Sequence, residues 1–208
     1  MLGNHSSPPI HYWAGKYPNR IGWLVGPSAM TKTKLREWMP YALDNDAFTA
    51  WENGSEWEEK AYFTFLDWVA TQKIKPLWAA VPDVVTDKDG TLHNWKKYAP
   101  RLKNYGWPLA FVAQDGMNPS DVPDEAALVF IGGSYEWKWR SVAKFTGLFP
   151  RVHVGRVNTL YRLRRCDELG VESVDGTGWF RRPEAEFFQL EEYLAGKPHP
   201  QLTLTYHE

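Results

Sequence analysis

Short apolar runs alternate along the chain with longer amphipathic stretches. The apolar runs end in Gly, Asp or Pro, and we expect strands at residues 21–26, 41–48, 76–85, 108–116, 127–134, 151–157 and 170–179. Between them, apolar positions at helical spacing predict helices at residues 31–39, 55–73, 91–105, 136–148, 158–169 and 184–195. A regular alternation of strand and helix predicts βα units and a parallel sheet.

Seven predicted strands allow either a (β/α)8-type barrel or a doubly wound sheet. We expect a compact, TIM-barrel-like α/β domain over residues 1–208. Barrels usually have about 250 residues, so its helices would be clipped. The eighth strand would come from HYWAG near the start or from LTLTY near the end. We expect the termini, residues 1–10 and 197–208, to be loosely ordered.

Bulk composition excludes several classes of protein. The chain is 43% hydrophobic, which is enough for a core, and it has no apolar run of about 18 residues that would span a membrane. The N-terminus lacks the basic and apolar regions of a signal peptide, so we expect a cytoplasmic protein with no membrane partner. A single cysteine, Cys166, excludes an internal disulfide and a multi-cysteine zinc site. The histidines His11, His93 and His153 have no paired spacing, and we expect no metal.

Charge is balanced over the whole chain but not along it. The net charge is −1, yet the segment from Lys138 to Cys166 has no acidic residue and eight basic ones: Lys138, Arg140, Lys144, Arg151, Arg156, Arg162, Arg164 and Arg165. Arg181 and Arg182 follow shortly afterwards. These residues either cover solvated helix faces or form a basic surface for a phosphate backbone.

Polar or glycine-rich residues follow five of the predicted strands, in LDNDAF, VPDVVTD, FVAQDG, FIGGS and ESVDGTGW. The carboxyl ends of parallel strands in α/β proteins converge on one mouth, where ligands bind. We therefore expect six residues to meet there: Asp44, Asp83, Gln114, Gly132, Gly133 and Asp175. Each also has a local explanation as a helix cap, an Asx-turn or a sharp glycine turn.

The order of these motifs resembles the tRNA-guanine transglycosylases and the related deazapurine transglycosylases that phages and bacteria use to modify DNA. The resemblance consists of LD-x-x-x-F, a strand-end Asp, VAQDG, IGG and a late Gly-Val-x-x-x-Asp, and it covers residues 41–182. That family is a TIM barrel that breaks the N-glycosidic bond of a base, holds the sugar covalently on an Asp, and inserts a 7-deazaguanine. It implies DNA and a free 7-deazaguanine base as partners, no cofactor, and the host cytoplasm if a phage encodes the chain.

The resemblance assigns a role to each strand-end residue. Asp175 matches the nucleophile, Asp44 the aspartate that touches the base and assists proton transfer, and Asp83 the aspartate that recognises the guanine edge. Gln114 and the backbone of Gly132 and Gly133 match the groups that contact the base and its carbonyl. The basic residues would hold the nucleic-acid backbone: Lys138, Arg140, Arg156, Arg162, Arg164, Arg165, Arg181 and Arg182.

These residue types suit the chemistry. A carboxylate can capture the oxocarbenium-like C1′ as a covalent intermediate, as in retaining glycosidases. Asp83 can accept from N1–H and the 2-amino group of guanine, and the amides of Gly132, Gly133 and Gln114 can donate to O6. An embedded base must first be unstacked.

Two departures from the family pattern bear on the substrate. The family's Ser-Gly-Gly is replaced here by Asn45-Asp46-Ala47, so we expect Asn45 and Asp46 to make the base pocket more polar. The cysteine-rich zinc site that helps engage tRNA is absent, which favours a small DNA-modifying relative over an ordinary tRNA enzyme. Two alternatives stay open: a catalytically altered barrel that only binds nucleic acid, and an unrelated small-molecule lyase or isomerase that uses the carboxylates as acid and base.

Overall fold

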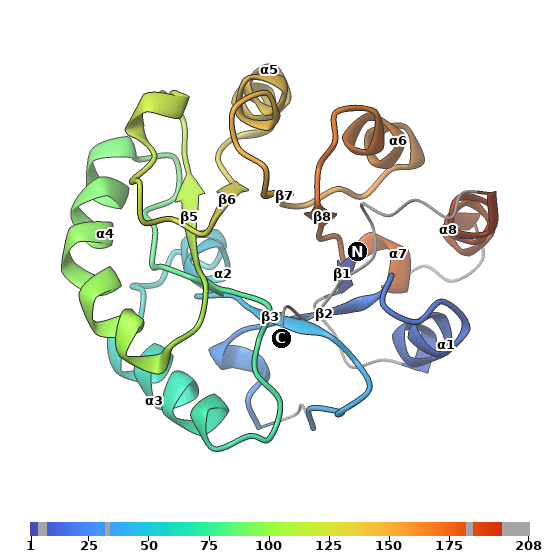
Figure 1. Ribbon diagram of the computed structural model, residues 1–208, viewed down its shortest axis with the longest axis horizontal. Helices are drawn as coiled ribbons and strands as arrows, with labels where there is room; N and C mark the ends of the chain where they lie inside the picture. Colours follow the sequence, from blue (N-terminus) through green and yellow to red (C-terminus); the bar gives the residue numbers. More distant parts are fainter. Residues whose placement is uncertain (4–7, 32–33, 182–184, 197–208) are drawn as a thin grey trace.

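The protein forms an eight-stranded, all-parallel sheet in the strand order β1 to β8. The computed structural model describes residues 1–3, 8–31, 34–181 and 185–196. The strands are β1 (Leu2–Gly3), β2 (Gly22–Val25), β3 (Tyr41–Leu43), β4 (Ala79–Ala80), β5 (Leu109–Ala113), β6 (Leu128–Ile131), β7 (Val152–Val154) and β8 (Ser173–Val174). A parallel bridge between Leu2 and Asp175 brings β8 back to β1, so the barrel is nearly closed (Figure 1). The predicted (β/α)8 TIM-barrel-like fold is confirmed.

Helices surround the barrel (Figure 1). They are α1 (Pro8–Lys16), α2 (Ala47–Glu52), α3 (Glu59–Ala70), α4 (Lys88–Leu102), α5 (Tyr135–Thr146), α6 (Leu160–Glu168), α7 (Gly178–Arg181) and α8 (Ala185–Gly196). Short 3-10 helices span Pro27–Ala29, Lys103–Tyr105 and Pro119–Asp121. Several helices are short, such as the six residues of α2 and the nine of α6, which is how a barrel fits into this chain.

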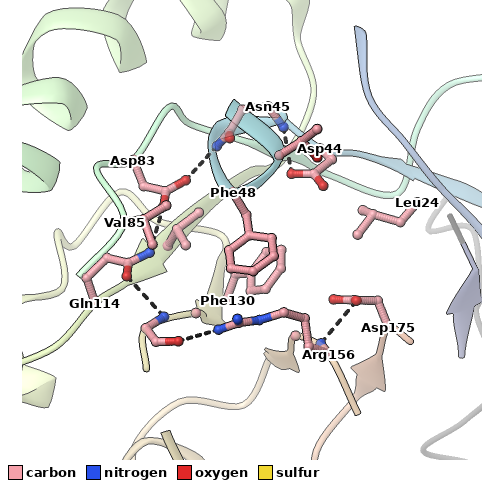
Figure 2. Close-up of a pocket in the computed structure, with 15 residues that line it drawn as sticks. Leu24, Asp44, Asn45, Phe48, Asp83, Val85, Gln114, Phe130, Arg156 and Asp175 are labelled. Atoms are coloured by element: carbon pink, nitrogen blue, oxygen red, sulfur yellow. Dashed lines mark hydrogen bonds between the residues drawn. The ribbon is translucent and has the colours of Figure 1, made fainter. Parts of the chain in front are cut away.

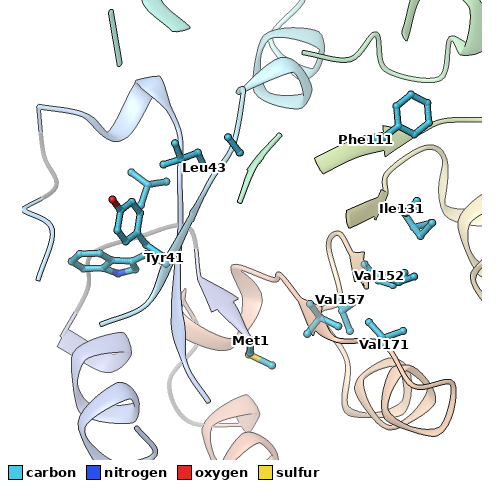
Figure 3. Close-up of a cluster of buried hydrophobic side chains, with 14 of the residues drawn as sticks. Met1, Tyr41, Leu43, Phe111, Ile131, Val152, Val157 and Val171 are labelled. Atoms are coloured by element: carbon cyan, nitrogen blue, oxygen red, sulfur yellow. The ribbon is translucent and has the colours of Figure 1, made fainter. Parts of the chain in front are cut away.

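Two apolar clusters follow from the alternation of side chains along the strands. One fills the barrel interior and consists of Leu2, Leu24, Ala42, Trp78, Ala80, Ala110, Val112, Leu128 and Phe130. The larger cluster lies between the strands and the helices and includes Leu43, Phe111, Ile131 and Val152 (Figure 3). The fully buried Trp78 is the largest side chain of this inner cluster.

The eighth strand comes from neither of the two expected segments. It is β1 at Leu2–Gly3, whereas HYWAG lies in α1 and LTLTY lies outside the described residues. Within the expected N-terminal segment, residues 2–3 form β1 and residues 8–10 begin α1. The buried Met1 amino group donates to the Arg20 carbonyl at 2.7 Å and ties the start of the chain to the barrel. Residues 197–208 lie outside the described part of the chain.

Two predicted elements differ from the structure. No helix forms at residue 31 or over 34–39 of the predicted helix 31–39. Of the described residues there, only Met39 is a buried apolar side chain, too little packing to stabilise a short helix. The predicted strand 41–48 ends at Leu43, and α2 begins at Ala47. This early end places Asp44 and Asn45 in the loop at the barrel mouth.

Candidate active site

A pocket opens at the carboxyl ends of the strands, and we call it the mouth pocket (Figure 2). Its lining comes from most of the barrel and consists of Leu24, Asp44, Asn45, Phe48, Thr49, Asp83, Val85, Val112, Gln114, Phe130, Gly132, Gly133, Gly155, Arg156 and Asp175. The structure thus brings together all six strand-end residues that the sequence placed at one mouth, and Asn45 with them. The roles assigned to them stay predictions.

Asp83 is held by two side-chain amides at one end of the mouth pocket. Its Oδ1 accepts from Asn45 Nδ2 at 2.8 Å, and its Oδ2 accepts from Gln114 Nε2 at 2.6 Å. Burial raises the pKa of Asp83 to about 6, and the hydrogen bonds from Asn45 and Gln114 lower it in part. The carboxyl group is therefore fixed in place and changes charge just below neutral pH.

The glycine amides expected to meet a base carbonyl are already occupied. The Gly132 N–H donates to the Ala113 carbonyl at 3.0 Å, and the Gly133 N–H donates to Gln114 Oε1 at 3.0 Å. Gln114 Oε1 also accepts from the Thr86 N–H at 2.9 Å. The expectation of two free backbone donors is therefore wrong in this arrangement. These bonds instead fix the Gln114 side chain that holds Asp83.

Gly133 has a backbone reason to be glycine. Its φ is +63°, in the left-handed region, and a Cβ there would lie 2.6 Å from the Trp137 ring and 2.7 Å from Asp115 Oδ2. Asp115 accepts from the Ser134 N–H at 2.6 Å, directly before α5. The glycine thus permits a sharp turn from β6 into α5, with its carbonyl directed at Arg156.

Asp44 is the most perturbed carboxyl group of the mouth pocket. Burial raises its pKa to about 8, and the nearby carboxylates Asp46, Asp175 and Asp83 add to the rise. Its Oδ1 accepts from the Asn45 N–H at 2.8 Å, which opposes the shift. At neutral pH this carboxyl group carries a proton that it can donate.

Asp175 lies against a buried histidine, His153, that sequence reasoning treated as structural. Asp175 is 4% exposed, its Oδ2 lies 3.1 Å from His153 Nε2, and its Oδ1 accepts from the Arg156 N–H at 3.1 Å. His153 Nδ1 lies 2.8 Å from Ser173 Oγ. Burial lowers the pKa of His153, so the ring is neutral and Nε2–H donates to Asp175 while Nδ1 accepts from Ser173. His153 pairs with Ser173 across β7 and β8, and Asp175 follows Ser173 by two residues, just after β8. This spacing was the available signal.

Arg156 forms a wall of the mouth pocket, where sequence reasoning had placed only a phosphate contact. Its guanidinium lies 4.2 Å from the centre of the Phe48 ring and donates to the Gly133 carbonyl. Its backbone has φ +57°, an uncommon conformation for a non-glycine residue. Figure 2 shows Phe48 projecting into the pocket between the Asp44 side and the Arg156 side. The ring and the guanidinium give the pocket a flat, cationic surface.

Asp46 does not line the mouth pocket, contrary to the expectation that it contacts the base. Its Oδ2 accepts from the Ser28 N–H at 2.7 Å, and a Cβ on Gly26 would collide with its carboxylate. Its backbone is left-handed, with φ 59°, which turns the side chain toward the loop after β2. Asn45 is buried and bonded to Asp83 and to the Val81 carbonyl, so it lines the pocket and also holds Asp83 in place.

A second, wider hollow lies next to the mouth pocket, and we call it the outer groove. It shares Phe48, Thr49, Arg156 and Asp175 with the pocket and adds Glu52, Tyr135, Lys138, Trp139, Asn158, Thr159, Arg162 and Thr177. Lys138 is buried here and donates to the Gly155 carbonyl. Burial, followed by the positive charge of Arg156, lowers the pKa of Lys138 to about 7. The phosphate contact expected of Lys138 stays a prediction, and in this structure its ammonium group is buried and bonded to Gly155.

The other basic residues assigned to a nucleic-acid backbone differ in their surroundings. Arg162 lines the outer groove, as Arg156 does. Arg164 pairs with Glu192 at 3.4 Å and Arg165 with Glu168 at 3.2 Å, while Arg140 lies in a separate hollow beside Asp115. Arg181 ends α7 with a side chain outside the described atoms, and Arg182 lies outside the described residues.

The described residues contain no group of three or more His, Cys, Asp or Glu side chains arranged to hold a metal ion. Within the same residues, no helix has the length and apolar character needed to cross a membrane. Models of known protein families give no match to the chain, and no curated protein matches it significantly. The eight-stranded parallel sheet establishes the fold class, and a function has to be argued from the chemistry of the mouth pocket.

Proposed function

We propose that this chain is a transglycosylase that exchanges guanine in DNA for a free 7-deazaguanine base. One observation carries the proposal: three carboxyl groups with different environments line one pocket of a (β/α)8 barrel. Asp175 is hydrogen-bonded to a neutral histidine ring and a backbone amide, Asp44 keeps its proton at neutral pH, and Asp83 is fixed by two amides. Carboxyl groups in such different environments suit distinct acid, base and nucleophile roles.

Asp44 and Asp175 supply the bond-breaking step in this proposal. A carboxylate oxygen of Asp175 attacks C1′, the C1′–N9 bond breaks, and its electron pair leaves with the base, which takes the proton from Asp44. The incoming deazaguanine then gives its N9 proton to Asp44 and attacks C1′, and the ester to Asp175 breaks. Figure 2 shows Asp44 and Asp175 on two sides of the pocket, as this sequence of steps requires.

Asp83, Phe48 and Arg156 supply base recognition. The Asp83 carboxylate, ionised above about pH 6, accepts from N1–H and the 2-amino group of a guanine-like base. Phe48 offers a ring face, and Arg156 offers a cation with remaining N–H donors for O6. Arg156 thus takes the part that the sequence had assigned to the glycine amides.

A base-exchange assay tests the proposal. Labelled guanine or 7-deazaguanine is incubated with single-stranded and double-stranded DNA, and incorporation is counted. We expect wild-type incorporation, a loss of about 100-fold or more in Asp44→Asn, which removes the proton donor, and little change in Asp46→Asn. Asp46→Asn is the matched control because it lies two residues away and can still accept from Ser28. Absence of incorporation with all nucleic acids would refute the proposal.

One observation favours a second function, a barrel that binds nucleic acid without exchanging bases. The amides of Gly132 and Gly133 and the Gln114 carbonyl are all committed to internal hydrogen bonds. This function predicts salt-dependent DNA binding with no incorporation of label by the wild type. The exchange assay therefore separates the two.

A further inference from the structure

The outer groove continues directly from the mouth pocket across Asp175, Arg156 and Phe48. A nucleotide whose C1′ faces Asp175 and whose base fills the mouth pocket has its phosphates outside that pocket. The outer groove is the hollow that adjoins Asp175 on that path. The outer groove is therefore the surface on which the sugar-phosphate chain of such a nucleotide would lie.

Arg162 lines this groove and forms no ion pair with a carboxylate among the described residues. Its Nε and Nη2 donate to the Tyr135 hydroxyl at 3.2 and 3.0 Å. Its guanidinium lies 4.3 Å from the centre of the Trp139 ring, and the rings of Tyr135 and Tyr161 are within 5.3 Å. The aromatic rings hold the guanidinium in place, and the N–H groups that remain can meet phosphate oxygens.

The neighbouring arginines of α6 differ in this respect. Arg164 and Arg165 are exposed and form ion pairs with Glu192 and Glu168. The aromatic rings around Arg162 are also exposed, at 58% for Tyr135 and 70% for Tyr161. Exposed rings next to a fixed cation are the combination that single-stranded nucleic-acid sites use, with rings for base faces and cations for phosphates.

We propose that the outer groove binds an unpaired polynucleotide strand, with Arg162 on a phosphate adjoining the reacting nucleotide and Tyr135 and Tyr161 against neighbouring bases. The proposal rests on the proposed function for the identity of the strand as DNA. An unpaired strand is favoured over a duplex because a duplex hides the base faces that the rings would contact. A base inserted in the mouth pocket has also already left its stack.

Substitution of Glu52 tests where the strand lies in the outer groove. The Glu52 carboxylate lines the groove and repels phosphate, so the strand is confined to the side of Arg162. Glu52→Gln is expected to tighten strand binding at low salt by roughly twofold to fivefold. Weaker or unchanged binding in this variant would place the phosphates outside the outer groove.

Binding of a fluorescein-labelled 12-nucleotide DNA strand, followed by anisotropy over a series of salt concentrations, tests the proposal. We expect Arg162→Ala to lower affinity about tenfold or more, because a charged hydrogen bond is lost, and to reduce the salt slope by about 0.7. Arg164→Ala, on the same helix, is the matched control and should change affinity by less than about twofold. Equal losses in both variants would overturn the proposal, since they would indicate only general charge attraction.

Two tyrosine variants test the proposed contact between the aromatic rings and the neighbouring bases. Tyr161→Ala is expected to weaken strand binding about fivefold or more, whereas Tyr12→Ala, an exposed tyrosine on α1, should leave it unchanged. A duplex of the same sequence should bind more weakly than the single strand. Tighter duplex binding, or no effect of Tyr161→Ala, would overturn the assignment to an unpaired strand.

The strand-binding measurements and the exchange assay test the two proposals independently. Arg162-dependent strand binding without incorporation of label supports the groove and refutes the transglycosylase. Incorporation that is unaffected by Arg162→Ala supports the transglycosylase and refutes the groove.

Discussion

Asp44 and Asp46 are two residues apart and lie in different environments. Asp44 lines the mouth pocket, where burial and other carboxylates raise its pKa to about 8, whereas Asp46 accepts from the Ser28 N–H on the other side of the loop. The left-handed backbone at Asp46, with φ 59°, separates the two side chains. The sequence Asp-Asn-Asp does not by itself distinguish the two side chains. The backbone turn that separates them depends on the close approach of Gly26.

The role of His153 was the hardest to infer from the sequence alone. His153 is fully buried, its ring lies 4.5 Å from the Phe130 ring and 5.0 Å from the Trp78 ring, and it touches Asp175 rather than the pocket. In the proposed reaction it is a positioning residue, since it holds the Asp175 carboxylate through Nε2–H. A lone histidine in a strand is compatible with simple core packing, so only its contact with Asp175 identifies this role.

Substitution of His153 tests that role. We expect His153→Phe to lower kcat for base exchange about tenfold or more, because the donor to Asp175 is lost. The KM for the free base should stay unchanged because His153 does not line the mouth pocket. His153→Gln, which keeps an amide donor, should recover part of the rate. Circular dichroism checks folding, and wild-type kcat in His153→Phe would contradict the positioning role.

At the scale of elements, the strands were predictable and their ends were not. β5 and β6 are continuous apolar runs, typical of strands buried on both faces, and their observed bounds lie inside the predicted ones. β1 has only two residues, Leu2 and Gly3, which is too short for any periodicity. Its place is fixed by pairing with β2 and by the bridge to Asp175, both long-range contacts.

The same distinction applies to the polar residues on these elements. Convergence of the strand ends follows from the parallel sheet, so the sequence could place Asp44, Asp83, Gln114 and Asp175 together. It could not show that the glycine amides are consumed by Ala113 and Gln114, because that depends on the register of β5 and β6. Nor could it separate Arg162 from Arg164, since helical phase alone does not reveal which carboxylates lie within reach.

At the scale of the whole molecule, the mouth pocket lowers stability. The folded-state pKa of Asp44 is raised from 3.8 to about 8, so the folded protein retains a proton that the unfolded chain has released between these pH values. Stability from this group is therefore present below about pH 4 and is lost as pH rises toward 8. Functional sites that need side chains with shifted pKa values commonly reduce the stability of the fold in this way.

Asp44→Asn removes this titration and tests the account by thermal unfolding. We expect the variant to be more stable than wild type at pH 7.5, by on the order of 1–3 kcal/mol, because no carboxylate has to be kept neutral by burial. Near pH 3 the two proteins should unfold at nearly the same temperature, since Asp44 is then neutral in the folded and largely neutral in the unfolded chain. A stability difference that does not change with pH would contradict the assigned cause.

The central claim is that Asp175 holds the sugar covalently during base exchange, and intact-protein mass spectrometry tests it most directly. Wild type is incubated with a guanine-containing DNA strand without added base and then denatured in acid, conditions under which the ester is retained. We expect a species heavier by the mass of the strand minus guanine, mapped by peptide digestion to Asp175 and absent in Asp175→Asn. An adduct on another residue, or one that persists in Asp175→Asn, would contradict the account.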